Sequence, residues 1–258
     1  MKFKWIYAVA ALLLLAALAY LLLLKPEGGG EIEGRRALVV DSLYEWIPND
    51  DLLKFLVKAL REKGYNVTLI KGRDATVDAF RNLTLYNLII IRCHGGYLSP
   101  GDTLGGDVLD DYAPVIFTGE PFSECLPLSC KYYRERLSEE VVAGEFEYEG
   151  ERIRVFALTP IFFRNLDGRF KEGTVMVVAS CYGLCGKTLA KTLFGKGLDY
   201  FVSWDWKVSP GHMDKGLRML VEEAVVNGVD WKEAVKLVSG ELGPDPWGGG
   251  VLKIESSG

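Results

Sequence analysis

The chain has 258 residues, of which 49% are hydrophobic, and a net charge of -5 at pH 7. This length and apolar content are sufficient to bury a full hydrophobic core, so we expect one main folded domain. No basic patch or run of Lys and Arg is visible, and nucleic-acid binding is therefore not expected. The five cysteines are an odd number, so at least one stays outside any intrachain disulfide.

The first segment predicts a membrane anchor. Residues 5–24 carry no charge and are mostly Leu and Ala. At about 1.5 Å per residue they would span roughly 30 Å, the thickness of a bilayer core. Lysines precede this run and mostly glutamates follow it, so the positive-inside bias predicts a cytoplasmic N-terminus and an extracytoplasmic remainder. A cleaved signal peptide is the alternative, because residues 17–19 (ALA) resemble a cleavage site.

The chain is therefore divided into a transmembrane anchor at 1–25, a glycine-rich linker at 26–35 and one domain at 36–258. Strands are expected at 36–43, 66–70, 86–93, 153–159, 174–179 and 199–208. Helices are expected from a cap at 49–51 to about 63 and at 76–83, 187–194, 214–227 and 230–238, and 162–170 is expected to be part of a helix or a turn. The stretch 99–150, with Pro, Gly and many charges, is expected to be irregular. The alternation predicts the α/β class, with an open, mostly parallel sheet and helices on both faces.

Two of the expected strands end in residues that carry chemistry. The strand at 86–93 is followed by the sequence HGG, and the strand at 174–179 is followed by SCYG. Function in such sheets sits beyond the carboxyl ends of the strands. His94 can act as general base and acid, and Cys181, facing a helix N-terminus, is expected to have a lowered pKa. The N–H groups of Gly95 and Cys181 are candidates for an oxyanion hole.

The same turn has a competing interpretation. Gly186, Lys187 and Thr188 open a helix after a buried strand, as the end of a phosphate-binding loop does. That loop requires a glycine five residues before Gly186, and Cys181 stands there instead. A nucleotide-binding α/β domain is therefore the less favoured alternative.

The two motifs together resemble those of the caspase-like cysteine peptidases. This group includes caspases, metacaspases, legumain, clostripain, gingipain, separase and the CHAT-domain proteases. In order, the chain has an apolar strand with His-Gly and then an apolar strand with Ala-x-Cys-x-Gly, within roughly residues 36–210. The resemblance implies a thiol protease with His94 and Cys181 as the catalytic dyad and Gly95 at the oxyanion. Two departures are the long His-to-Cys spacing, caused by the stretch 99–150, and Ser180 where alanine is usual.

The last expected strand contains a specificity motif by the same resemblance. Ser203-Trp204-Asp205 is similar to the Ser-Trp-Arg strand of caspases, in which the arginine helps to hold an acidic P1 side chain. Asp205 reverses that charge, and Asp41 ends the first strand, from which relatives draw another pocket residue. Two carboxylates at the pocket would favour Arg or Lys at P1. Pairing of Asp205 with Lys207 is the alternative.

The sequence thus predicts a membrane-anchored, extracytoplasmic cysteine endopeptidase that acts on protein or peptide substrates. A catalytically inactive caspase-like binding module, tethered to the membrane, is the alternative from another functional class. No cofactor is expected, although a run of acidic residues is compatible with weak calcium binding. That run comprises Asp102, Asp107, Asp110 and Asp111. Cys125 and Cys130 are candidates for a disulfide, and this pairing is left open.

Overall fold

The computed structural model describes residues 34–126 and 129–258. The predicted anchor and nearly all of the predicted linker lie outside these ranges, so both stay predictions. Within the described ranges, no helix combines the length and the apolar character needed to cross a bilayer.

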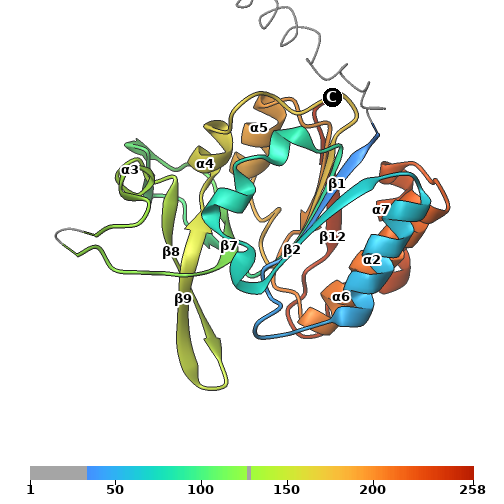
Figure 1. Cartoon of the computed structure of the whole chain (residues 1–258), viewed down its shortest axis with the longest axis horizontal. Coiled ribbons are helices and arrows are strands. Elements are labelled where there is room, and N and C mark those ends of the chain that lie inside the picture. Colours follow the sequence, from blue (N-terminus) through green and yellow to red (C-terminus); the bar gives the residue numbers. More distant parts are fainter. Residues whose placement is uncertain (1–33, 127–128) are drawn as a thin grey trace, which may run out of the picture. The chain divides into compact units, whose positions relative to one another are not determined.

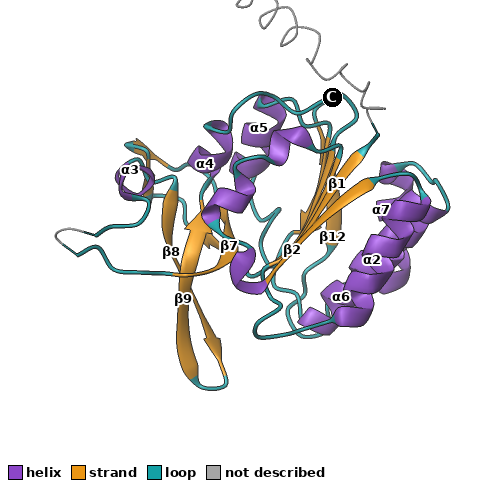
Figure 2. Cartoon of the chain, viewed as in Figure 1, coloured by secondary structure: helices purple, strands orange, loops and turns teal. Residues whose placement is uncertain are grey.

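Six strands form the main sheet, and every neighbouring pair is parallel except the pair of β11 and β12. In spatial order they are β12 (Leu252–Ser256), β11 (Tyr200–Trp204), β10 (Val175–Ala179), β3 (Leu88–Arg92), β1 (Arg36–Asp41) and β2 (Asn66–Lys71). The central strands β3 and β10 are buried along their whole length, as expected for strands covered on both faces. This confirms the predicted α/β class with a mostly parallel sheet (Figures 1 and 2).

Helices cover both faces of this sheet (Figure 1). One face carries α2 (Asp50–Glu62), α6 (Pro210–Val221) and α7 (Trp231–Leu242). The Asn49 side chain caps α2 by accepting a hydrogen bond from the Leu52 N–H, and the helix buries its leucine-rich face. The other face carries α4 (Pro160–Arg164), α5 (Thr188–Gly195) and short 3₁₀ turns at Gly72–Asp74, Val77–Phe80 and Leu83–Leu85.

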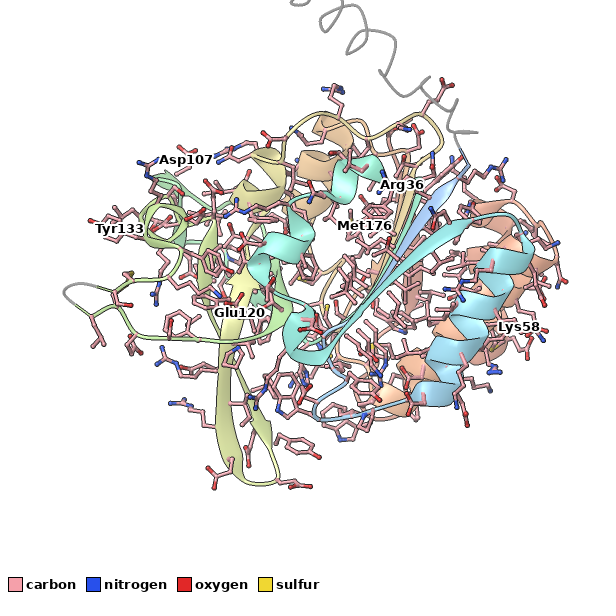
Figure 3. The ribbon with its side chains drawn as sticks, viewed as in Figure 1. Arg36, Lys58, Asp107, Glu120, Tyr133 and Met176 are labelled. Atoms are coloured by element: carbon pink, nitrogen blue, oxygen red, sulfur yellow. A yellow bond between two sulfur atoms is a disulfide. The ribbon has the colours of Figure 1, made fainter. Side chains whose placement is uncertain are left out.

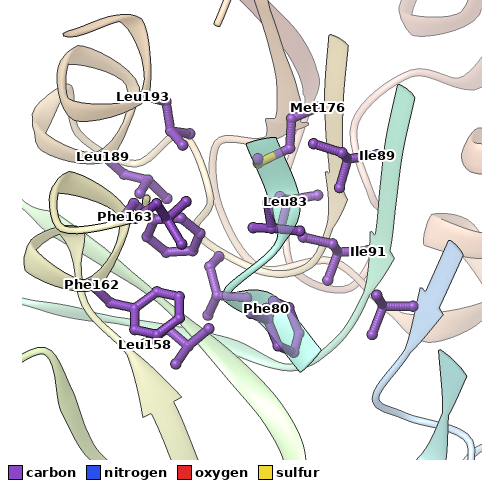
Figure 4. Close-up of a cluster of buried hydrophobic side chains, with 14 of the residues drawn as sticks. Phe80, Leu83, Ile89, Ile91, Leu158, Phe162, Phe163, Met176, Leu189 and Leu193 are labelled. Atoms are coloured by element: carbon purple, nitrogen blue, oxygen red, sulfur yellow. The ribbon is translucent and has the colours of Figure 1, made fainter. Parts of the chain in front are cut away.

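Two apolar layers fill the space between the sheet and these helices. Phe80, Phe163, Met176 and Leu189 belong to the layer beneath α4 and α5 (Figure 4). Trp204 belongs to the layer beneath α2, α6 and α7. Figure 3 shows how densely side chains occupy both layers. Arg35–Gly258 forms one compact unit.

The stretch 99–150 is not irregular throughout, and the prediction for it was wrong. It supplies two strands, β7 and β8, of a second, antiparallel sheet of four strands. Its strands, in spatial order, are β4 (Gly95–Leu98), β7 (Ala113–Pro121), β9 (Glu151–Leu158) and β8 (Val141–Tyr148). The same stretch holds α3 (Tyr133–Leu137) and the small ribbon of β5 (Thr103–Leu104) and β6 (Asp107–Val108). The hairpin of β8 and β9 projects from this sheet (Figure 1).

Other differences from the predicted elements are local. The strand expected at 199–208 ends at Trp204, and β12 was not predicted. The helix expected at 76–83 consists of 3₁₀ turns, and α6 continues into a π-helical turn at Glu222–Val226. Cys125 and Cys130 form a disulfide.

Candidate active site

The ends of β3 and β10 bring the two candidate catalytic residues side by side along the backbone. Arg92 is paired with Ala179 in the sheet register, and the Cys93 N–H donates to the Ala179 carbonyl at 3.0 Å. His94 and Cys181 each follow this pair by two residues along their own segment. A Cβ atom at position 95 would clash with the Cys181 carbonyl oxygen, so this close approach requires the glycine that is present.

The His94 side chain is enclosed by aromatic rings. Its imidazole stacks on Phe146 of β8 with ring centroids 3.9 Å apart, and the Trp46 ring lies 6.4 Å away. The Nε2 atom is buried and has no hydrogen-bond partner among the described residues. Burial, with the nearby positive charge of Arg92, lowers the pKa of His94 to about 4. The imidazole is therefore neutral at pH 7, the form a general base requires.

The Cys181 thiol lies near a loop that follows β11. Its Sγ donates to the Val208 carbonyl at 3.5 Å and accepts from the Val208 N–H at 3.4 Å. Burial raises the pKa of this thiol, so the predicted lowering was wrong. The helix whose N-terminus was expected to act on the thiol begins only at Thr188. In the described chain, no hydrogen bond joins the His94 and Cys181 side chains.

Two backbone N–H groups at this edge are available to an oxyanion. The Phe117 N–H donates to the His94 carbonyl at 3.1 Å, which makes Gly95 and Ile116 the non-hydrogen-bonded pair of the β4–β7 ladder. The Gly95 N–H is therefore directed away from β7. The Cys181 N–H makes no hydrogen bond to another residue in the described part of the chain. Both groups belong to the backbone segments that touch each other.

Three of the predicted substrate-binding residues are buried and do not line a surface. Ser203 is 0% exposed, and its Oγ donates to the Val178 carbonyl at 2.6 Å. Trp204 is 0% exposed in the core beneath α6. Asp41 is 0% exposed and accepts a hydrogen bond from Arg92 at 2.9 Å. A substrate side chain cannot reach these groups in this conformation, which corrects their predicted placement.

The fourth predicted residue, Asp205, is partly exposed but already paired. Its carboxylate lies 2.7 Å from the Lys253 ammonium and accepts from the Val251 N–H at 2.8 Å. The partner is thus on the unpredicted strand β12, and not Lys207 as the alternative had it. Neither Asp41 nor Asp205 offers an unpaired carboxylate, so these two residues give less support to a basic P1 preference, which stays a prediction.

A buried charge network lies just before His94. The Arg92 guanidinium contacts Asp214 of α6 at 2.6 and 2.9 Å, and it also donates to Asp41 and to the Ile47 carbonyl. Asn49, the cap of α2, donates to Asp214 at 2.8 Å. One side chain therefore ties together β1, β3, α6 and the loop that carries Trp46.

The phosphate-loop alternative meets a specific obstacle. The Lys187 N–H, at the start of α5, donates to the Asp111 carboxylate at 2.9 Å. A carboxylate therefore occupies the position where a phosphate would bind at this helix N-terminus. Asp102 likewise accepts from a backbone group, the Ser99 N–H. Over residues 34–126 and 129–258, no cluster of three His, Cys, Asp or Glu side chains is arranged to hold a metal ion.

The sequence reasoning missed the aromatic residues that surround this edge. Phe146 and Trp46 lie against His94, and four further aromatic side chains form a cluster that includes Tyr182, the residue after Cys181. Those four are Tyr97, Tyr112, Tyr182 and Trp206. They come from segments far apart in the sequence, so no local pattern joins them.

In comparisons with known proteins, no family model and no curated protein matches this chain. Assignment of a function therefore depends on the geometry of the strand ends.

Proposed function

We propose that the chain is a membrane-anchored, extracytoplasmic cysteine endopeptidase of the caspase-like type, with His94 as base and Cys181 as nucleophile. The observation that supports this most is the contact between two strand ends. Gly95 packs directly on the Cys181 carbonyl, so the residue before Gly95 and the cysteine flank one spot at the carboxyl edge of the sheet.

The proposed reaction is acyl transfer to the thiol. His94 takes the proton from the Cys181 thiol as the sulfur attacks the peptide carbonyl and forms a C–S bond. The Gly95 and Cys181 N–H groups stabilise the negative oxygen of the tetrahedral intermediate. The imidazolium then gives its proton to the amine nitrogen as the peptide C–N bond breaks and the thioester forms. Water, activated by His94, attacks the thioester, and the C–S bond breaks to release the carboxylic acid product and restore the free thiol.

The resting arrangement requires one rearrangement before this reaction. The His94 ring stacks on Phe146, and the Cys181 thiol exchanges hydrogen bonds with the Val208 backbone. Each of the two side chains therefore contacts another residue instead of its catalytic partner. Catalytic hydrogen bonds in free enzymes are often long and tighten only when substrate is bound. We expect the imidazole to turn towards Sγ as the substrate backbone enters.

The inactive binding module is a second candidate, because the His94 and Cys181 side chains are not hydrogen-bonded to each other. A raised thiol pKa and a histidine without a hydrogen bond to the thiol would also be found in a domain that has lost catalysis. The two candidates differ in whether Cys181 reacts with an electrophile presented on a peptide.

A peptidyl acyloxymethyl ketone, added to the full-length chain in detergent, distinguishes them. The enzyme proposal predicts covalent labelling at Cys181 by mass spectrometry, and strongly slowed labelling in His94→Ala. Cys185→Ala is the matched control, because Cys185 is another partly exposed free cysteine nearby and its loss should leave labelling intact. Labelling at Cys185, or none beyond the rate of a simple alkylating agent, would favour the binding module.

A further inference from the structure

Four aromatic side chains form a continuous cluster that includes Tyr182, the residue after the proposed nucleophile. Tyr97 contacts Tyr182 with ring centroids 4.8 Å apart and Tyr112 at 5.1 Å, in edge-to-face arrangements. Trp206 contacts Tyr182 at 5.0 Å and also neighbours Tyr97 and Tyr112. We call these four residues the aromatic wall.

The wall is attached to the same strand ends as the proposed dyad. Tyr97 lies on β4, three residues after His94, and Tyr182 directly follows Cys181. Trp206 follows β11, and its carbonyl accepts a hydrogen bond from the Tyr182 N–H at 3.2 Å. The wall therefore includes the residue next to Cys181, and two of its rings are carried by the strand ends at which the reaction is proposed to take place.

Tyr112 is held in the wall by backbone contacts. It comes from the stretch 99–150, which we call the insertion. The carboxylate of the neighbouring Asp111 accepts a hydrogen bond from the Lys187 N–H, just before α5. A Cβ atom at Gly186 would clash with the Tyr112 carbonyl, so the two backbones are in close contact. The insertion is thus fixed against the turn that carries Cys181.

The wall presents apolar surface to solvent. Tyr97 is 36% exposed and Trp206 is 40% exposed. The nearest predicted specificity acid, Asp205, is neutralised by Lys253. Rings that contact each other at steep angles leave faces and edges for a further ring to pack against. A large apolar or aromatic side chain would bury the most apolar surface there, and its binding would be the most favourable.

We infer that the aromatic wall selects substrates with a large apolar or aromatic side chain at P1, the residue whose carbonyl is attacked. This inference rests on the proposed peptidase function. Cation–π attraction of the same rings for Arg or Lys would be the competing chemistry. The rings face no unpaired carboxylate from Asp41 or Asp205, so the apolar choice is favoured.

The test uses peptides that differ only at P1, which is Phe, Leu, Ala, Arg or Asp, with the full-length chain in detergent. We expect kcat/KM for Phe to exceed that for Ala by roughly tenfold or more, the range of discrimination by an apolar pocket. Trp206→Leu and Tyr97→Leu should each lower the Phe-to-Ala ratio of kcat/KM about fivefold. Tyr133→Leu, which removes an exposed tyrosine on α3, should leave the ratio unchanged.

The outcomes separate this inference from the function on which it rests. The inference is overturned if kcat/KM is highest for the Arg or Asp peptide, or if neither variant changes the Phe-to-Ala ratio. Either result would leave the proposed peptidase function intact. No cleavage of any peptide, together with no labelling of Cys181 by the ketone probe, overturns both. If a variant unfolds, as shown by its thermal transition, the P1 profile of the wild type alone decides.

Discussion

The imidazole of His94 lies stacked on the phenyl ring of Phe146, with ring centroids 3.9 Å apart and planes inclined by 29°. Phe146 belongs to β8, in the hairpin of the second sheet, whereas His94 follows β3 of the main sheet. The insertion therefore covers the proposed base. Because burial favours the neutral imidazole, the Phe146 ring contributes to keeping His94 neutral.

Removing the ring should make His94 easier to protonate. With a pKa of about 4, His94 is almost entirely neutral at neutral pH and gains a proton as the pH falls through that value. Phe146→Ala admits water, so we expect the pKa to rise towards the unperturbed value of about 6.5. NMR titration of the imidazole signals measures this directly, because the chain has only two histidines.

The control for that titration is Tyr148→Ala, another aromatic residue of β8 on the same hairpin. It should leave the titration of His94 unchanged. A wild-type pKa near 6.5, or no difference between wild type and Phe146→Ala, would show that Phe146 does not cover the base in solution.

The charge network below the site should be a major contributor to stability. Arg92→Met leaves Asp41 and Asp214 without their cation, and loss of one partner from a buried pair typically costs about 3–5 kcal/mol. Arg92 is 1% exposed on its side chain and Asp41 is 0% exposed, so water cannot replace the lost partner. Urea unfolding of the variant should show this loss as a lower midpoint.

Lys58→Met is the control for Arg92→Met, because it also replaces a paired cation by methionine, but at the protein surface. Lys58 pairs with Glu62 on α2, and both side chains are largely exposed. Exposed pairs contribute about 0–1 kcal/mol, so this variant should unfold close to the wild type. Similar losses for both variants would mean that the network around Arg92 is not a special feature of the fold.

The sequence predicted the buried parallel strands of the main sheet better than the antiparallel strands of the second sheet. β3 and β10 were predicted because they read as unbroken apolar runs, which parallel strands buried on both faces require. β7 was missed because Pro114 and Gly119 interrupt its apolar residues. β8 does alternate apolar and acidic residues around Phe146, so a signal for it existed.

The candidate site was predicted in its backbone but not in its surroundings. Placement of His94 and Cys181 at strand ends follows from local sequence. The partner of Asp205 could not be predicted because Lys253 lies on β12, which was itself missed. The cover over His94 could not be predicted because Phe146 reaches it through a second sheet whose pairing is set by long-range contacts.

The topology predicted for the N-terminal segment leads to a simple fractionation experiment. The full-length chain should sediment with membranes, because residues 5–24 are long and apolar enough to span a bilayer. Protease added outside intact cells should degrade the domain, since the positive-inside bias predicts that the domain is exported. A domain that is degraded only after lysis would contradict the orientation.

The central claim is that His94 and Cys181 together cleave peptide bonds. The most direct measurement is the rate of peptide cleavage by the full-length wild type, by Cys181→Ala and by His94→Ala, with thermal unfolding to show that each variant is folded. We expect the wild type to cleave, and each variant to lose on the order of 10³-fold or more in kcat/KM. A folded Cys181→Ala or His94→Ala variant that cleaves at a near-native rate would contradict the dyad.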